Sequence, residues 1–165
     1  MRKTLLLAAA ISLILLGFLM SCELSGMSDV EFAKALMEGS ADSTELYSPP
    51  SKSFGSGDNG LTWDIVSYLE DPVGTHNWEI LFTFTDYTPP FAPNSIVTGS
   101  LTAYVAIDTD EQTVTIDFDG SLTVVGEHAG DYLYTARLVI DLATGEYEYS
   151  GQVRIGSTVH EVTTK

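Results

Sequence analysis

Apolar and polar residues alternate along most of the chain from Leu61 onward, which is the pattern of half-buried β-strands. Because the side-chain period of a strand is two, one face of each segment is expected to meet a core and the other water. Short turns separate the segments, so neighbouring strands should pair as an antiparallel meander. The apolar sets that share a face are Leu61, Trp63, Ile65 and Leu69; Trp78, Ile80, Phe82 and Phe84; Val97, Leu101, Ala103, Val105 and Ile107; Tyr132, Tyr134, Ala136, Leu138 and Ile140; and Tyr147, Tyr149, Val153 and Ile155.

The stretch from Gln112 to Val125 allows two interpretations, because Asp117-Phe118-Asp119-Gly120 has the composition of a tight turn. As one long strand, the stretch has the apolar set Val114, Ile116, Phe118, Leu122 and Val124. Its pairs with the preceding strand are then Ile107 with Val114, Val105 with Ile116, Ala103 with Phe118, Leu101 with Gly120, and Gly99 with Leu122. A large residue meets a small one in three of these five pairs, and such cross-strand fit stabilises a sheet. We therefore favour one long strand over a hairpin.

Near the C-terminus, Gly156-Ser157 suits a two-residue type II′ hairpin. Ile155 then pairs with Thr158 and Val153 with His160, which places His160 and Val162 on the inner face and Glu161 outside. About seven strands result, and long strands in that number do not stay flat. The predicted fold class is all-β: an antiparallel meander forming a curled sheet or a partly closed barrel, with a sandwich as the alternative.

A short helix is predicted ahead of the strands, from 29 to 38. Ser28 and Glu31 have the spacing of a capping box, and Gly39 stands where a helix often ends. Val30, Ala33 and Met37, flanked by Leu36, make one apolar stripe, so the helix is expected to dock rather than float. Residues 40–60 are rich in Ser, Pro and Gly and are predicted to be a mostly irregular linker, which places the β domain at 61–165.

The first residues have the organisation of a secretory signal: a basic start at Arg2 and Lys3, then an apolar run from Leu5 to Met20. This run is short for a membrane-spanning helix, and no basic stop-transfer flank follows it. The segment Leu19-Met20-Ser21-Cys22 resembles the lipobox of bacterial lipoproteins. The resemblance covers the signal segment alone. It implies that residues 1–21 are a removed signal peptide and that Cys22 is acylated, for instance by palmitate, and anchors residues 22–60 as a tether to a membrane.

Loss of residues 1–21 leaves 144 residues with 5 basic and 23 acidic side chains, a formal charge of −18. Nucleic acid is an implausible partner for such a chain, and anionic lipid headgroups should repel the domain from the surface that holds its anchor. No thiol remains beyond Cys22, which excludes disulfides within the domain and cysteine chemistry. In lipoproteins of Gram-negative bacteria, an aspartate after the lipidated cysteine favours retention in the inner membrane. Glu23 is not that residue, so the expected location is the cell envelope, with the outer membrane favoured over the inner.

The chain shows little that indicates catalysis. Its three histidines, His76, His128 and His160, lack metal-ligand spacing, and no Gly-x-Ser-x-Gly nucleophile motif occurs. The acidic turn from Asp108 to Glu111, with Asp117 and Asp119 beyond it, lacks the residue order of an EF-hand. We expect no enzyme activity, no cofactor, no metal and no calcium dependence.

Aromatic side chains predominate on the predicted inner face, where they either fill the core or line a pocket. Four tyrosines on adjacent strands, together with one histidine, are the candidate ligand-binding residues: Tyr132, Tyr134, Tyr147, Tyr149 and His160. The preferred hypothesis is an interaction or structural module with an unknown partner. The alternative is a carrier of a small apolar or aromatic ligand, and an enzyme ranks third. A carrier needs an enclosed volume on the order of 300 Å³ or more, whereas an interaction module should be solidly packed.

The same pairing rule, carried across the sheet, predicts Gly120 opposite Ala136 and Ala136 opposite Gly151. A row of small inner residues should form a crease where the sheet coils most strongly. The expected occupant of the crease is an aromatic ring, Trp63 or Phe82, followed by the 29–38 helix and then by a ligand.

Overall fold

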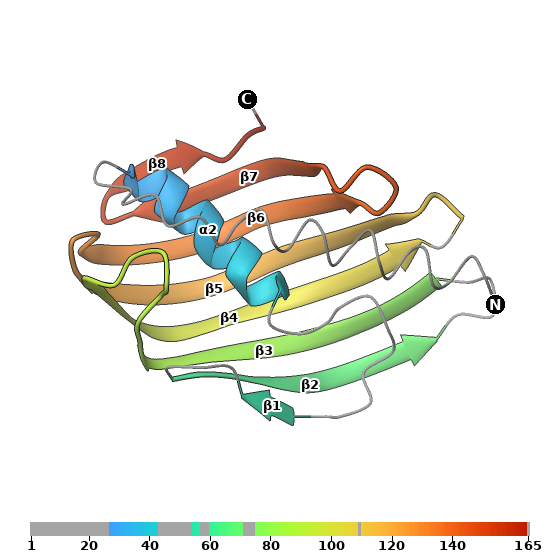
Figure 1. The fold of residues 1–165 in the computed structure, drawn as a ribbon, viewed down its shortest axis with the longest axis horizontal. Coiled ribbons are helices and arrows are strands. Elements are labelled where there is room, and N and C mark those ends of the chain that lie inside the picture. Colours follow the sequence, from blue (N-terminus) through green and yellow to red (C-terminus); the bar gives the residue numbers. More distant parts are fainter. Residues whose placement is uncertain (1–26, 43–53, 57–59, 71–74, 109, 165) are drawn as a thin grey trace.

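The computed structural model describes residues 27–42, 54–56, 60–70, 75–108 and 110–164, and these form one helix and one antiparallel sheet (Figure 1). The elements in chain order are α2 (Asp29–Asp42), β1 (Phe54–Ser56), β2 (Leu61–Glu70), β3 (Thr75–Tyr87), β4 (Ser95–Asp108), β5 (Thr113–Gly126), β6 (Gly130–Asp141), β7 (Tyr147–Ile155) and β8 (Thr158–Glu161). Strand order in the sheet follows chain order. The predicted antiparallel meander with a short N-terminal helix is therefore confirmed. One strand, β1, lies in the stretch predicted to be mostly irregular.

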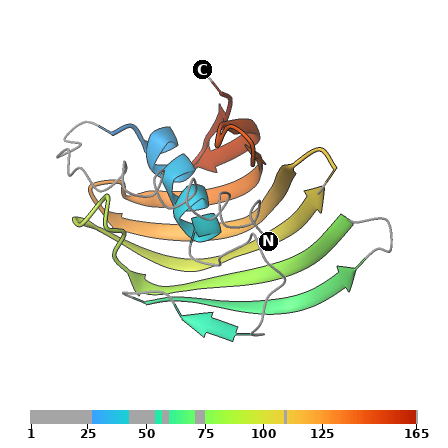
Figure 2. The same ribbon diagram turned by 45° about the vertical axis from the view of Figure 1, so that its right-hand side comes forward.

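The sheet curls around α2 without closing, as Figure 2 shows. Its two edges are the short strands β1 and β8, of three and four residues, and each pairs with a single neighbour. The inner faces of the strands and one side of α2 share a single hydrophobic core. None of the described residues belongs to a helix long and apolar enough to cross a membrane.

The long strand predicted between Gln112 and Val125 is confirmed as β5, and each of its five predicted pairs with β4 is present. Alternate residues of β5 are buried, in accordance with a strand that faces a core on one side. The C-terminal hairpin is also confirmed, with Ile155 opposite Thr158 and Val153 opposite His160. Gly156 has a φ of 59°, which the first turn residue of a type II′ hairpin requires.

Strand β2 differs from its predicted pattern in its second half. The pairing with β3 shifts between Ile65 and Ser67, where β2 contains an extra residue. Beyond this bulge, Tyr68 lies opposite the buried Trp78, and Leu69 pairs with Asn77 instead. The prediction that Leu69 continues the inner set was wrong, because one inserted residue exchanges the two faces of a strand.

The predicted row of small residues is only partly present. Ala136 lies opposite Gly151 as expected, but Gly120 pairs with Tyr134, and Ala136 pairs with Phe118. Strands β5 and β6 turn around Glu127, one residue earlier than the predicted register requires. This turn is held against the loop before β4, because the backbone N–H of Glu127 donates to the carbonyl of Asn94 (3.3 Å). Ala136 and Gly151 consequently share a row with the large Phe118, while Gly120 lies in the next row between Leu101 and Tyr134, so no single crease of small residues forms.

Helix α2 begins where the capping box predicts. The Ser28 backbone N–H donates to Glu31 Oε2 (3.0 Å), and the Glu31 N–H donates to Ser28 Oγ (3.2 Å). The helix continues to Asp42, so the predicted end at Gly39 was wrong. Ser40 and Ala41 are buried in this extension, and the Ser40 hydroxyl is satisfied by donating to the Leu36 carbonyl (2.8 Å). The fully buried stripe consists of Phe32, Ala33, Leu36, Met37 and Ala41, whereas Val30 is only partly buried.

Candidate functional site

The candidate tyrosines on β6 are buried beneath α2. Tyr134 donates its hydroxyl to the carbonyl of Ala33 in the helix (3.4 Å), and Tyr132 donates to the carbonyl of His128 in the β5–β6 turn (3.0 Å). Burial raises the pKa of both phenols above the usual value, because the charged form would lose its hydration. These two residues therefore fasten the helix and the turn to the sheet as neutral hydrogen-bond donors.

The candidates on β7 and β8 lie toward the edge of the sheet and are partly exposed. The Tyr149 hydroxyl donates to the Glu38 carboxylate of α2, and Lys34 Nζ lies 4.8 Å from the centroid of the Tyr149 ring. Tyr147 lies opposite Ile140, and His160 is in one cross-strand row with Val153 and Tyr134. The structure thus brings Tyr132, Tyr134 and Tyr149 against α2 and places Tyr147 and His160 around them. The element that covers this part of the sheet is α2. Trp63 and Phe82, the aromatic residues expected to fill the crease, instead pair with each other on β2 and β3.

A junction at the start of α2 involves residues that the sequence did not single out. His128, with 5% of its surface exposed, stacks on Phe32 with ring centroids 4.5 Å apart. Its Nδ1 is 2.9 Å from Oδ1 of Asp29, and its backbone N–H donates to Ser95 Oγ (3.4 Å). This histidine joins the helix, the β5–β6 turn and the first residue of β4. In the sequence, His128 was only one of three histidines without metal-ligand spacing, and no signal linked it to Asp29.

The acidic turns considered for calcium make local contacts instead. Asp108 Oδ1 accepts the backbone N–H groups of Asp110 and Glu111, each at 2.9 Å, which stabilises the β4–β5 turn. Asp117 accepts two hydrogen bonds from Arg137, at 2.6 and 2.9 Å. Over the described ranges, no three His, Cys, Asp or Glu side chains gather in a way that could hold a metal ion. The side chain of His76 lies outside the described part.

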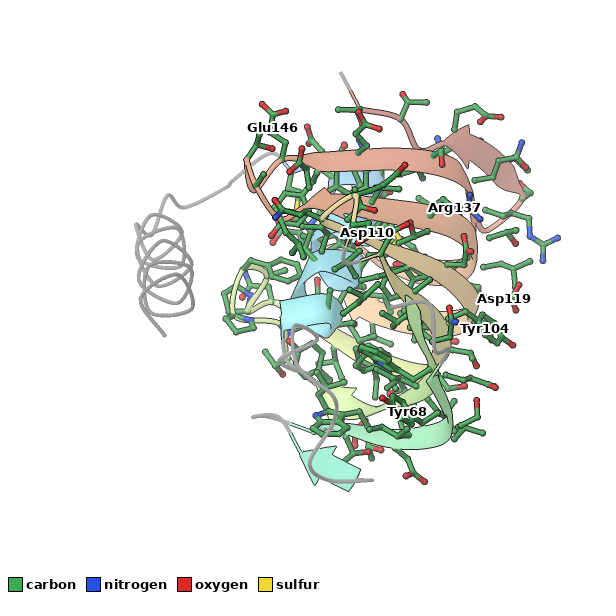
Figure 3. All side chains as sticks on the ribbon, turned by 90° about the vertical axis from the view of Figure 1, so that its right-hand side faces the viewer. Tyr68, Tyr104, Asp110, Asp119, Arg137 and Glu146 are labelled. Carbon is green, nitrogen blue, oxygen red and sulfur yellow. The ribbon has the colours of Figure 1, made fainter. Side chains whose placement is uncertain are left out.

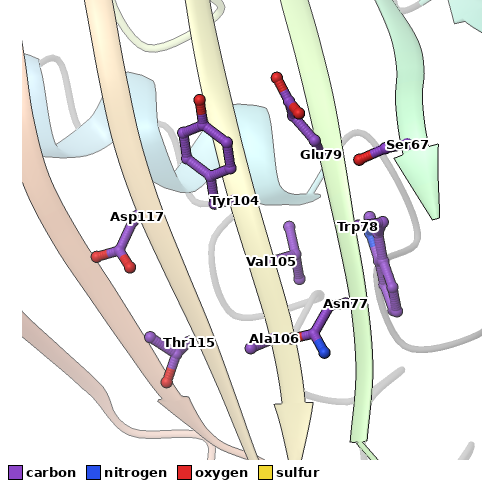
Figure 4. A pocket seen from close by; sticks show the side chains of 9 residues that line it. All are labelled: Ser67, Asn77, Trp78, Glu79, Tyr104, Val105, Ala106, Thr115 and Asp117. Carbon is purple, nitrogen blue, oxygen red and sulfur yellow. The ribbon is translucent and has the colours of Figure 1, made fainter. Parts of the chain in front are cut away.

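The outer face of the sheet, turned away from α2, carries Tyr104, Asp119 and Arg137 (Figure 3). A groove of about 400 Å³, open to solvent, crosses β3, β4 and β5 on this side. Figure 4 shows the nine residues that line it, with α2 behind the strands. The outward side chains among them are Ser67, Asn77, Glu79, Tyr104, Ala106, Thr115 and Asp117.

Cross-strand pairing sets the geometry of this groove. Tyr104 lies between Glu79 on β3 and Asp117 on β5, and Ala106 lies between Asn77 and Thr115 in the next row. Because the side chain of Ala106 is small, a hollow remains above it. The Tyr104 ring, 51% exposed, lies beside this hollow. These residues lie on the polar face of the strands, so the alternation of apolar residues gave no indication of them. The available signal was Tyr104 itself, a large ring at a polar position of the alternation.

A second open groove of about 360 Å³ lies between the start of α2 and the C-terminal residues. It is lined by Ser28, Val30, Glu31, Lys34, Tyr149, Glu161, Thr163 and Thr164. Lys34 closes one side by donating from Nζ to the Thr163 carbonyl (2.6 Å). This groove therefore marks the seam where the helix meets the last strand.

Comparison with known proteins adds no identity. No protein-family model, no curated protein and no solved structure matches this chain.

Proposed function

We propose that the chain is a lipoprotein of the bacterial cell envelope, anchored through lipid on Cys22, whose β domain acts as an interaction or structural module. The lipobox resemblance of Leu19-Met20-Ser21-Cys22 supports the anchor, and this segment lies outside the described residues. The outer membrane is the favoured location because Glu23 replaces the aspartate that retains such proteins in the inner membrane.

One observation carries the choice of a module over a carrier: α2 occupies the concave side of the sheet. Its buried stripe belongs to the same hydrophobic core as the inner strand faces. The hydroxyls of Tyr132, Tyr134 and Tyr149, which were candidates for contacting a ligand, bond to the helix or to the adjoining turn. A small ligand would have to displace the helix and these hydrogen bonds in order to enter.

The outer face is the side left for a partner. Several large apolar side chains are exposed on the outer face of β2 to β5: Val66, Leu81, Ile96, Tyr104 and Val125. Large apolar residues grouped with polar ones are typical of surfaces that bind other proteins. No part of this proposal requires catalysis.

Two measurements test the proposal. A photo-crosslinking amino acid placed at Tyr104 in the source bacterium should give a discrete protein adduct, while the same group at Glu146, in the turn after β6, should give none. Titration of the purified protein with N-phenyl-1-naphthylamine should show no saturable binding. Stoichiometric binding of this apolar dye, with no adduct from Tyr104, would establish the carrier instead.

A further inference from the structure

The charges on the first part of the sheet are all negative. The sequence contains no Lys or Arg between Lys52 and Arg137, an interval that spans β1 to β5 completely. The outward-facing acids on β2, β3 and β5 are Asp64, Glu79, Asp117 and Asp119. Clustered like charges produce a field that attracts ions of the opposite sign and repels a second copy of a chain with a net charge of −16.

The groove beside Tyr104 lies within this negative region. Glu79 and Asp117 flank the exposed ring on either side, but they are not equivalent. Asp117 is neutralised by its two hydrogen bonds with Arg137, whereas no cation pairs with Glu79 in the part of the chain that the structure describes. Glu79 therefore supplies the uncompensated charge at the groove.

An aromatic face next to a free carboxylate is the chemistry that binds an ammonium or guanidinium group. A cation within about 6 Å of a ring centroid is attracted by the ring, and a carboxylate adds charge-assisted hydrogen bonds. The hollow over Ala106, walled by Asn77 and Thr115, offers space for the alkyl stem of such a side chain.

An apolar border adjoins the groove. Leu81, 36% exposed, follows Glu79 on the outer face of β3, and Val66, 56% exposed, lies at the β2 bulge beside the Ser67–Glu79 pair. Apolar residues next to acidic ones suit a partner segment in which apolar and basic residues are interspersed. A free polyamine would make no use of this border.

We propose that the outer face of β2 to β5 binds a basic segment of a partner protein, with an Arg or Lys side chain entering the groove between Tyr104 and Glu79. This inference rests on the proposed interaction function and names the chemistry of the partner. A neutral glycan, which also stacks on exposed aromatic rings, is the competing ligand that the test must exclude.

The test uses the lipidated full-length protein in detergent micelles and fluorescein-labelled dodecapeptides that contain Leu, Ala and Arg. A twin peptide with citrulline for each Arg keeps the shape and removes the charge. Anisotropy titrations should give at least tenfold tighter binding of the Arg peptide than of the citrulline peptide. Tyr104→Ala and Glu79→Gln should each weaken Arg-peptide binding about fivefold, in the range expected for losing a cation–π contact or a charge pair.

Two matched variants on the other half of the sheet separate a site from a general charge effect. Glu148→Gln removes one exposed acid from β7, and Leu133→Ala removes one exposed apolar side chain from β6. Both variants should bind the Arg peptide with an affinity within twofold of that of the unmodified protein. An equal loss in Glu148→Gln, no preference for Arg over citrulline, or Tyr104-dependent binding of chitotetraose in place of the peptide would each overturn the inference.

The crosslinking result distinguishes the two levels of the proposal. If Tyr104 gives a protein adduct in cells but the Arg peptide shows no preference, the interaction function stands and the basic partner is wrong. If neither adduct nor peptide binding is found, the interaction function itself fails.

Discussion

Asp29, the first residue of α2, and His128, in the turn between β5 and β6, are 99 residues apart in the sequence, yet Oδ1 and Nδ1 lie 2.9 Å from each other. The imidazole ring is buried against Phe32. This contact joins the N-terminus of the helix to the turn at the ends of β5 and β6.

We predict that His128→Ala lowers the free energy of unfolding by about 2 kcal/mol, because it removes a buried ring from its stack and leaves Asp29 without a partner. Urea unfolding followed by tryptophan fluorescence measures the change. Glu127→Ala, an exposed neighbour in the same turn, should shift the free energy by less than about 0.5 kcal/mol. Equal values for the two variants would show that the junction does not stabilise the domain.

High pH should weaken the attachment of α2. Burial, and then the nearby Tyr132, raise the pKa of Tyr134 in the folded state, so the neutral phenol stabilises the fold fully below its usual pKa of about 10. That stability is lost as the pH rises above this value toward the folded-state pKa. Tyr134→Phe should be less stable than the unmodified protein at pH 8, by about 1 kcal/mol for the lost bond to Ala33, and this deficit should shrink by pH 11. Tyr104→Phe, on the exposed outer face, is the control and should match the stability of the unmodified protein at pH 8 in the same urea titrations.

Gly151→Val should destabilise the domain by a few kcal/mol. Gly151 has a φ of 103°, and a Cβ at this position would lie 2.5 Å from the Thr135 carbonyl oxygen and 2.8 Å from the Cα of Ala136. The added side chain thus meets backbone on the paired strand β6, which cannot rotate away. Ser150→Val, one residue earlier and exposed, is the control and should change thermal stability little.

Cys22→Ala should abolish lipidation and leave the precursor unprocessed, since the lipobox resemblance depends on this thiol. Metabolic labelling with palmitate should mark the unmodified protein and not the variant. Label of equal strength in both would refute the proposed anchor.

Thermal melting should be the same, within a degree or so, in calcium and in a chelator. The oxygens of Asp108 and Asp117 that face their neighbours are engaged by backbone N–H groups and by Arg137. Because a ligand that binds only the folded state must stabilise it, a clear rise in calcium would reveal a site at these turns.

The sequence predicted the strands and most of their pairing because the buried face determines which residues can oppose each other. The β4–β5 register followed from matching Phe118 to Ala103 and Leu101 to Gly120. The apolar pattern carries no information on bulges or on the exact position of a turn. An extra residue near Val66 exchanged the faces of β2, and a turn centred on Glu127 displaced Gly120 from Ala136. The helix end was wrong because Ser40 and Ala41 are held by tertiary burial, which outweighs the intrinsic tendency to stop at Gly39.

The candidate site was predicted less well, for a related reason. Inward tyrosines were correctly placed on the inner face, but their alternation could not reveal that α2 would meet their hydroxyls. The groove at Tyr104 depends on which outward residues become cross-strand neighbours, and Glu79, Tyr104 and Asp117 are separated by more than ten residues each in the chain. Such a site becomes visible only after the register is known.

The brevity of β1 and β8 would have a consequence if the protein carries the lipid anchor proposed above. Anchored molecules diffuse in two dimensions and meet one another often, and a long open strand at the sheet border would invite the next copy to extend it. β1 covers Thr62–Asp64 of β2, and β8 covers Gln152–Ile155 of β7, so the main-chain groups of these segments are already paired. The two short strands should therefore shorten the edge on which a neighbouring copy could add a strand.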